Sequence, residues 1–572
     1  MKNYKYYTQA SISAFALLCT LNAPAMAQVD QATGIADPSR IEEQFRTDAP
    51  LPTLEEDIAV ESRAPTNAPA GAENITFVLD TLEIEGVSAY NAAELAPVYN
   101  DFLGATVSLA DIYVIANDLT NKYRNDGFIL SQIVVPPQTI EGGVVRLRVV
   151  EGFVDQVIID GEGSESEQGV IRDLAANIRK NDAVNIADLE KFLLLINDLP
   201  GVNARTVLSP SRTQVGASDL RIIIARTAFD GMIGFDNFGS RYLGPAQFTA
   251  SGALNSFFGN NEKITGQFVT ATDVNEPELF YGSVRYEQPI NGLGTIAQAF
   301  VSHSDTEAGF DLEQFNVHGR STHAGIGVEH PFVRSRTRNF KMRAQLDWRK
   351  VESSNDVSLT RKDDLRVFRV GGTYDVLDTI FGAAAVTSFD AELSRGLDIL
   401  GASDKGDPDI TRADANPNSF LKVVAEAQRL QRLTNDVTLL LAARGQMADS
   451  ALLSSEEFGA GGINYGRGYD ASEIIGEDGF ATKVELQWNQ PLDAPIFTDY
   501  DVYSFYDFGK VWNDDATGSD DDESLASVGA GIRADFAYDI KGGFAVAVPL
   551  TRDVEVENDR DPRFYVNFSK SF

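Results

Sequence analysis

The sequence predicts a mainly β membrane protein, an outer-membrane β-barrel preceded by two small α+β modules. Three observations support this prediction. The chain begins with an export signal, and no later run approaches the ~18 to 20 apolar residues of a membrane-spanning helix. Residues 229–572 alternate between polar and apolar side chains and end on the aromatic Phe572. Because backbone groups in lipid must pair within the protein, spanning strands have to close into a barrel.

The export signal occupies residues 1–27. Lys2 and Lys5 precede a short apolar run, and Ala25-Met26-Ala27 forms a cleavage site with small residues on both sides of Met26. Cys19 is the only cysteine, and Leu18 before it does not fit a lipidation site. The mature chain therefore has no thiol, which excludes disulfides and cysteine catalysis.

Residues 28–74 are rich in Ala, Pro and Glu and are predicted to be a linker. One short helix is expected inside it, because Asp37-Pro38-Ser39 is a typical helix start and Arg40 to Arg46 can continue it. Pro50 and Pro52 would end this helix. The net charge of -36 argues against a nucleic-acid partner.

Residues 75–152 and 153–228 are predicted to form two tandem β-α-α-β-β modules. In the first, Ser108 and Asp111 open a helix that carries Leu119, and the β-branched runs 129–135 and 144–150 follow as strands. The second repeats this order, and the tripeptide Asn117-Asp118-Leu119 recurs as Asn197-Asp198-Leu199. A single larger α+β domain is the alternative.

The last strand illustrates the pattern of residues 229–572. Phe564, Val566, Phe568 and Phe572 fall on one face, where Lys570 is the one polar exception. Tyr565, Asn567, Ser569 and Ser571 fall on the other face. A soluble sandwich uses the same alternation with its sense reversed. Export and the terminal aromatic favour a barrel with a wet lumen, and Phe572 is the candidate signal that the barrel assembly machinery recognises.

Four separated motifs resemble those of the two-partner secretion transporters of the ShlB/FhaC/HecB type, over nearly the whole chain. The motifs are Gly127-Phe128-Ile129-Leu130-Ser131-Gln132 with Val149-Val150-Glu151-Gly152, Asp236-Asn237-Phe238-Gly239-Ser240-Arg241-Tyr242, Phe458-Gly459-Ala460-Gly461-Gly462 through Gly466-Arg467-Gly468-Tyr469, and Phe505-Tyr506-Asp507.

The resemblance implies a barrel of 16 strands in the outer membrane, with two POTRA modules on the periplasmic side and an N-terminal helix that plugs the pore. It also implies the function: capture of one large unfolded exoprotein, an adhesin or a haemolysin in relatives, and its transfer to the cell surface. The expected partners are that exoprotein, outer-membrane lipid and the barrel assembly machinery.

Two kinds of site follow. An exposed edge of a module sheet can accept a strand of unfolded cargo, and the candidate edges are residues 129–135, with Ile129 and Val134, and residues 220–225. Leu119 and Phe192 are candidate groove residues, although both also fit a module core. No catalytic residue, metal site or cofactor site is assigned, because His318 and His323 have opposite parity on one strand and no nucleotide-binding loop is found.

The second site is a loop anchor inside the pore, formed by Arg467, Gly468 and Tyr469 with Phe505 and Asp507. Phe505 and Asp507 are two residues apart and face the same side of a strand, so an inward Asp507 can hold the Arg467 guanidinium by two charge-assisted hydrogen bonds. The family usually has Val or Ile before this arginine. Gly466 stands there instead, which predicts a looser turn.

Two other functions compete with export. A general barrel-insertion factor of the same superfamily would share the barrel and usually carries more than two POTRA modules. A passive porin would explain the barrel but would leave residues 75–228 without a role.

Overall fold

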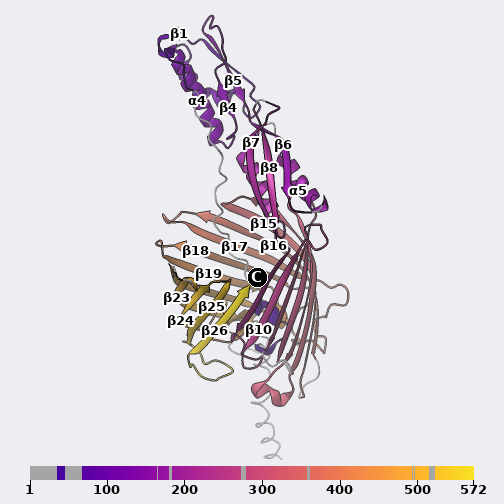
Figure 1. Ribbon diagram of the computed structural model, residues 1–572. Coiled ribbons are helices and arrows are strands. Elements are labelled where there is room, and N and C mark those ends of the chain that lie inside the picture. Colours follow the sequence, from indigo (N-terminus) through magenta and orange to yellow (C-terminus); the bar gives the residue numbers. More distant parts are fainter. Residues whose placement is uncertain are drawn as a thin grey trace, which may run out of the picture.

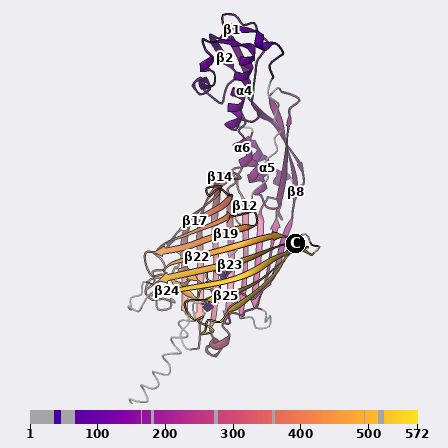
Figure 2. The ribbon, with the colours of Figure 1, turned by 90° about the vertical axis from the view of Figure 1, so that its left-hand side faces the viewer.

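A computed structural model describes residues 35–45, 67–163, 165–178, 183–214, 216–271, 278–356, 361–492, 494, 496–513 and 522–572. The export signal lies outside these ranges. Figure 1 shows a barrel with two small modules extending in a row from one of its ends, and Figure 2 shows the same arrangement from the side.

Module 1, farthest from the barrel, has two sheets packed on one long helix. β1 (Thr76–Val78) pairs with β3 (Thr106–Ser108), and the other sheet has the order β2 (Thr81–Glu85), β5 (Val144–Val150), β4 (Gln132–Val134). The helices are α3 (Ala92–Leu95) and α4 (Leu109–Asn125), with short 3-10 turns at Ala72–Asn74, Ala96–Val98 and Asn100–Phe102. The predicted helix start is confirmed, because Ser108 and Asp111 form a reciprocal capping box.

Module 2 lies between module 1 and the barrel. Its sheet has the order β6 (Phe153–Gly161), β8 (Ala217–Arg226), β7 (Val202–Pro210), covered by α5 (Glu165–Ile178) and α6 (Ile186–Asn197). The core combines buried residues of both helices with the inward face of β8, among them Leu174, Leu193, Ile196 and Ile222. Burial of these side chains is the main source of the module's stability.

Two predictions for the modules were wrong. The β-α-α-β-β order places one strand at the start of module 1, but residues 76–85 form two strands in two sheets, because the chain turns at Leu79 and Asp80, whose N–H groups bond to the carbonyls of Ala105 and Gly143. Residues 220–225 are not an edge, because β8 pairs in parallel with β6 on one side and in antiparallel with β7 on the other. The order of strands along the chain does not reveal this central position.

The predicted barrel is confirmed, and sixteen antiparallel strands close into a cylinder. In order they are β9 (Phe229–Asp236), β10 (Gln247–Asn255), β11 (Lys263–Ala271), β12 (Leu279–Pro289), β13 (Ile296–Glu307), β14 (His318–Arg334), β15 (Arg338–Ser354), β16 (Arg361–Asp378), β17 (Ala385–Gly396), β18 (Leu421–Arg432), β19 (Val437–Ala448), β22 (Asp478–Pro491), β23 (Phe497–Trp512), β24 (Asp522–Phe536), β25 (Ile540–Pro549) and β26 (Arg563–Ser571).

The barrel closes between its first and last strands. β26 pairs with β9 through five residue pairs, from Asn567↔Asp236 to Ser571↔Met232, whereas β14 and β15 share sixteen. The exposed side chains on the outer face are largely apolar, such as Phe564 and Phe568. Within the described ranges, no helix combines the length and apolar character needed to cross a bilayer.

Two segments occupy the barrel interior. The first, called here the plug segment, is residues 35–45 and includes the short helix α2 (Ile41–Gln44). The second, called here the long loop, is residues 449–477 between β19 and β22, with the 3-10 turn Ser454–Glu456 and the hairpin of β20 (Phe458–Ala460) and β21 (Ile474–Gly476). The remaining 3-10 helix, Phe310–Phe315, joins β13 and β14.

Candidate functional site

The loop anchor joins the long loop to the inner wall of β23. Arg467 Nε donates to Asp507 Oδ2 at 2.9 Å, and Arg467 Nη2 donates to Asp507 Oδ1 at 2.8 Å. The Arg467 backbone N–H also donates to Asp507 Oδ2 at 3.0 Å. The guanidinium lies 3.4 Å from the centroid of the Phe505 ring. The structure therefore brings together the predicted residues with the predicted bidentate geometry.

A second carboxylate, which the sequence analysis missed, completes this contact. Glu485 on β22 accepts from Arg467 Nη1 at 2.5 Å and from Arg533 Nη2 at 2.8 Å. Arg467, Asp507 and Glu485 are 3%, 0% and 1% exposed. These three charges are almost completely excluded from water. Removal of one charged partner from such a buried group strongly destabilises the folded protein.

Glycine allows the turn around Arg467 to approach the wall closely. Gly466 has φ of 129°, and a Cβ added there would lie 2.9 Å from both Gly461 Cα and Leu525 Cδ1. A Cβ on Gly468 would lie 2.8 Å from Ser527 Cβ. The expectation of a looser turn was wrong, because the left-handed backbone and the close packing at Gly466 exclude a branched residue in this chain.

Aromatic side chains fix the loop next to the anchor. Tyr469 is fully buried, and its hydroxyl donates to the Ala526 carbonyl at 3.1 Å. The Tyr565 hydroxyl donates to the Arg467 carbonyl at 2.7 Å. The loop is therefore held through its backbone as well as through the arginine side chain.

The first turn of the long loop has its own buried ion pairs. Glu456, 2% exposed, pairs with Arg369 at 2.6 Å and with Lys422 at 2.6 Å. Lys422 Nζ also donates to the Glu456 carbonyl at 2.9 Å. The loop is consequently fixed to the barrel at several separated places, among them β16 with β18 and β22 with β23.

The plug segment is bound mainly to the opposite wall. Glu42 lies 2.7 Å from His323 Nδ1 and accepts from Arg349 Nη2 at 3.2 Å. Arg349 Nη1 also donates to the Ser39 carbonyl at 2.7 Å, and Ser304 donates to the Pro38 carbonyl at 2.6 Å. The segment therefore contacts β13, β14 and β15 through both side chains and backbone.

Arg40 connects the plug segment to the long loop. It is 5% exposed and donates to Ser472 Oγ at 2.8 Å and to the carbonyls of Ser454 at 2.8 Å and Glu457 at 3.1 Å. The predicted helix start at Asp37 was wrong, because Asp37 accepts from the Ser39 N–H at 2.8 Å within a turn, and α2 begins at Ile41 with Arg40 as a cap that has no side-chain cap bond. The helix itself is shorter than predicted; Arg46, Pro50 and Pro52 lie outside the described residues.

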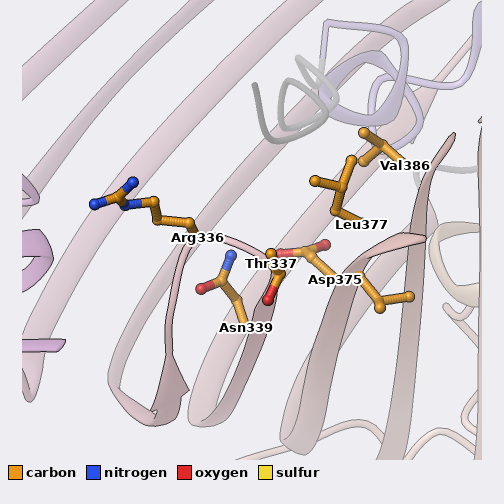
Figure 3. A pocket seen from close by; sticks show the side chains of 7 residues that line it. Arg336, Thr337, Asn339, Asp375, Leu377 and Val386 are labelled. Atoms are coloured by element: carbon orange, nitrogen blue, oxygen red, sulfur yellow. The ribbon is translucent and has the colours of Figure 1, made fainter. Parts of the chain in front are cut away.

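Module 2 docks on the turns of the nearer barrel end. Arg334 forms a bidentate pair with Asp198 with both distances 2.8 Å, and the Arg336 N–H donates to Glu190 at 2.8 Å. Figure 3 shows Arg336 extending away from Asn339 and Asp375, which line a small pocket at this end of the barrel. A cavity of about 530 Å³ lies between module 2 and the adjacent ends of β12 to β16.

The four candidate cargo residues differ in accessibility. Leu119 is 0% and Phe192 is 9% exposed, and both belong to module cores, so neither offers an open groove in this structure. Ile129 is half-buried in the turn before β4. Val134 is half-buried in β4, which pairs only with β5 and is an edge strand of its sheet.

The Glu151 carboxylate organises the start of module 1. It accepts from the Ala89 N–H at 2.9 Å, from the Tyr123 hydroxyl at 2.8 Å and from Ser88. Burial opposes ionisation of Glu151, but these hydrogen bonds outweigh it and lower the pKa of the carboxyl below its ordinary value. Glu151, in the motif Val149-Val150-Glu151-Gly152, therefore stabilises the fold of module 1.

Phe572 lies at the closing seam of the barrel. Its N–H donates to the Gly231 carbonyl, and its carbonyl accepts from the Gly231 N–H, both at 2.9 Å. Its ring stacks on Phe229 with centroids 6.1 Å apart and is 58% exposed. Its recognition by assembly machinery stays a prediction.

A closed 16-stranded barrel with an inward-folded loop and preceding POTRA-type modules defines an outer-membrane transporter of the two-partner secretion class. Residues 77–152 match the family model "POTRA domain, ShlB-type". Residues 216–534, more than half of the chain, match the model "Haemolysin secretion/activation protein ShlB/FhaC/HecB". The chain belongs to this family, and its barrel lies in the outer membrane with the POTRA modules in the periplasm.

Curated relatives and solved structures agree. The chain is 25% identical over 498 residues to the heme/hemopexin transporter protein HuxB of Haemophilus influenzae (strain 86-028NP), with 84% of each chain covered. It is 23% identical over 478 residues to the outer membrane transporter CdiB of Dickeya dadantii, with 82% of each covered. The structure of CdiB from Escherichia coli shares the fold, with a TM-score of 0.73, 20% identity and coverage of 96% and 98%.

Proposed function

We propose that this protein captures one partner exoprotein in the periplasm in an unfolded state and passes it through the barrel to the cell surface. The observation that carries the proposal is the buried contact of Arg467 with Asp507 in a barrel of this family. This contact fixes the long loop inside the lumen. The loop can then direct the unfolded partner along the polar inner wall. The partner is of the adhesin or haemolysin class, and no enzymatic step or cofactor is part of the proposal.

The first contact with the partner is proposed at the free edge of β4 in module 1. An unfolded chain carries unpaired backbone groups, and β4 is at the end of its sheet, so a partner strand can add beside Val134, although the Ile133 N–H already donates to Thr120 Oγ1 at 3.1 Å. Side chains of the partner would then contact the half-buried surface around Ile129. The fully buried Leu119 is left out of this contact surface.

The plug segment is proposed to leave the lumen before export. It occupies the interior through contacts of Glu42 and Arg40 with the wall and the long loop. A polypeptide that crosses the lumen competes with the plug segment for this space. Release of the plug therefore accompanies engagement of the partner, while the loop anchor stays in place.

The test is deletion of the gene followed by proteomics of the cell surface and the medium. Loss of one large secreted protein, restored by the intact gene, is expected. Broad loss of outer-membrane barrels would instead identify an insertion factor. An open, ion-conducting channel in planar bilayers, without any secretion defect in the deletion strain, would identify a porin.

Phe572 is proposed to act during assembly of the transporter itself. Its exposed ring at the end of the last strand is accessible to the barrel assembly machinery. Replacement of Phe572 by Ala should lower the amount of folded barrel in the outer membrane, measured by heat-modifiable migration in gels. An unchanged amount would contradict this role.

A further inference from the structure

The apolar band on the outer face ends at a defined height on β13 to β17. Outward side chains up to this height are apolar or aromatic and exposed, among them Val301, Ile326, Met342, Phe368 and Leu393. Trp348 lies at its upper limit on β15. Side chains of the opposite parity, such as His323 and Arg349, contact the plug segment inside.

Charged side chains replace the apolar ones directly above this limit, toward the extracellular end. They share the outward parity of the band, since strand residues alternate between faces. The cations are Arg320 on β14, Lys350 on β15 and Lys362 on β16, and the carboxylates Asp305, Glu352 and Asp364 lie beside them in the strand register. Lys362, the farthest, is six residues from Phe368, about 20 Å along the strand at ~3.3 Å per residue.

These cations are accessible rather than built into the fold. Arg320 is 66%, Lys350 53% and Lys362 52% exposed. Their partners are exposed carboxylates on the same face: Arg320 pairs with Asp305 at 3.1 Å, and Lys350 and Lys362 pair with Glu352 at 3.0 and 3.7 Å. Exposed pairs of this kind contribute little stability and exchange readily for other anions.

The composition of the chain makes this placement informative. The protein has a formal net charge of -36, yet three adjacent strands, β14 to β16, each place an exposed cation on the outer face just above the apolar band. The apolar band marks the hydrocarbon layer, so the headgroup region of the outer leaflet is expected at this height. Phosphate groups there can accept hydrogen bonds from ammonium and guanidinium groups.

We propose that Arg320, Lys350 and Lys362 form a binding surface for the phosphorylated headgroup of an outer-leaflet glycolipid, lipopolysaccharide. The apolar band below takes the acyl chains, and the cations contact the phosphates above them. Asp305 and Glu352 hold the cations extended along the wall in the absence of lipid. The surface would fix the height of β13 to β16 in the membrane while the lumen carries the partner.

The experiment uses the full chain purified in neutral detergent, with native mass spectrometry and thermal unfolding as readouts. The triple variant Arg320→Gln, Lys350→Gln, Lys362→Gln is compared with the unaltered chain. A matched control variant, Lys122→Gln, Arg146→Gln, Arg221→Gln, removes three ion-paired cations of the periplasmic modules. The added probes are lipopolysaccharide, dephosphorylated lipopolysaccharide and inorganic phosphate.

Lipopolysaccharide should bind the unaltered chain and the control variant equally, and the triple variant about tenfold more weakly. Dephosphorylated lipopolysaccharide should bind all three chains as weakly as the triple variant binds the intact lipid. Equal binding to the triple variant, or no effect of dephosphorylation, would overturn the proposal. Inorganic phosphate that binds as well as the lipid would also overturn the proposal. A change of oligomeric state in the triple variant that does not depend on lipid would overturn it too, and would assign the surface to a second copy of the chain.

Discussion

The long loop and the plug segment both occupy the lumen, but they are held differently. The loop anchor is sealed: Arg467, Asp507 and Glu485 are each at most 3% exposed. The acidic side chains of the plug segment are partly open, with Glu42 29% and Glu43 35% exposed at their ion pairs. Partly exposed pairs are screened and weak, whereas removal of a buried partner leaves an uncompensated charge.

The difference separates a fixed part of the pore from a removable one. The long loop is attached at both ends to neighbouring strands and is held by buried ion pairs at Glu456 and Arg467. It is therefore a fixed part of the pore. The plug segment is held by partly exposed ion pairs and hydrogen bonds that water or a passing polypeptide can replace, and by buried apolar contacts of Ile35 and Ile41 with the barrel wall. Arg40 is the buried charged residue of the plug segment, and its loss is expected to weaken the contact of the plug segment with the long loop.

The largest effect is expected at the loop anchor. Arg467→Ala removes one partner of a buried network, at a cost of about 3 to 5 kcal/mol, and should abolish export while the barrel still assembles. Secretion of the partner protein and the amount of folded barrel are measured together. Arg467→Lys should also fail, because lysine lacks the planar fork that contacts two carboxylates. Normal secretion by either variant would contradict a functional role of the anchor.

A smaller effect is expected for Glu485→Gln. The amide keeps the shape of the side chain but loses the charge that faces both Arg467 and Arg533. About 1 to 3 kcal/mol of loop stabilisation should be lost, which predicts reduced rather than abolished secretion. The matched control is Asp501→Asn, which affects Arg533 alone. If the two variants secrete equally well, Glu485 does not act through Arg467.

Arg40→Ala tests the plug segment without touching the anchor. Three hydrogen bonds to the loop are lost, and a change of ~1.4 kcal/mol would alter plug occupancy tenfold. We expect more frequent open events in planar bilayers and retained secretion. Arg285→Ala is the control, because Arg285 faces the lumen and bonds to Gln298 on the barrel wall. Equal conductance of the two variants would show that Arg40 does not retain the plug.

The smallest effect is expected in module 1, at Glu151. Its pKa is lowered in the folded protein, so its stabilising contribution is present above the ordinary value of 4.5 and is lost as pH falls below it through the folded pKa. Solvent screening limits this contribution to about 1 kcal/mol. Hydrogen exchange of β5 amides, corrected for intrinsic rates, should reveal acid loosening that Glu151→Gln lacks. Identical pH dependence in both chains would exclude Glu151 as its source.

Alternation predicted the barrel, because it fixes which side chains share a face. The Arg467–Asp507 pair was predicted from the resemblance of the loop and wall motifs to the family, together with the shared face of Phe505 and Asp507. The partners across the lumen were not predictable. Glu485 lies on another strand, and no short-range signal marks it as facing Arg467. His323 and Arg349 contact Glu42 from strands about three hundred residues away along the chain. The error at β8 has a related cause, because parallel pairing with β6 depends on how the helices cross the sheet.

The seam between β9 and β26 also sets the order in which the cylinder can form. Residues 232–236 must meet residues 567–571, more than three hundred positions later, and they share only five pairs. The entropy of closing so long a stretch is offset only when the intervening hairpins have already formed and brought the two ends near each other. Completion of the ring should therefore be the last event in the biogenesis of this transporter, and the step most sensitive to help from other proteins.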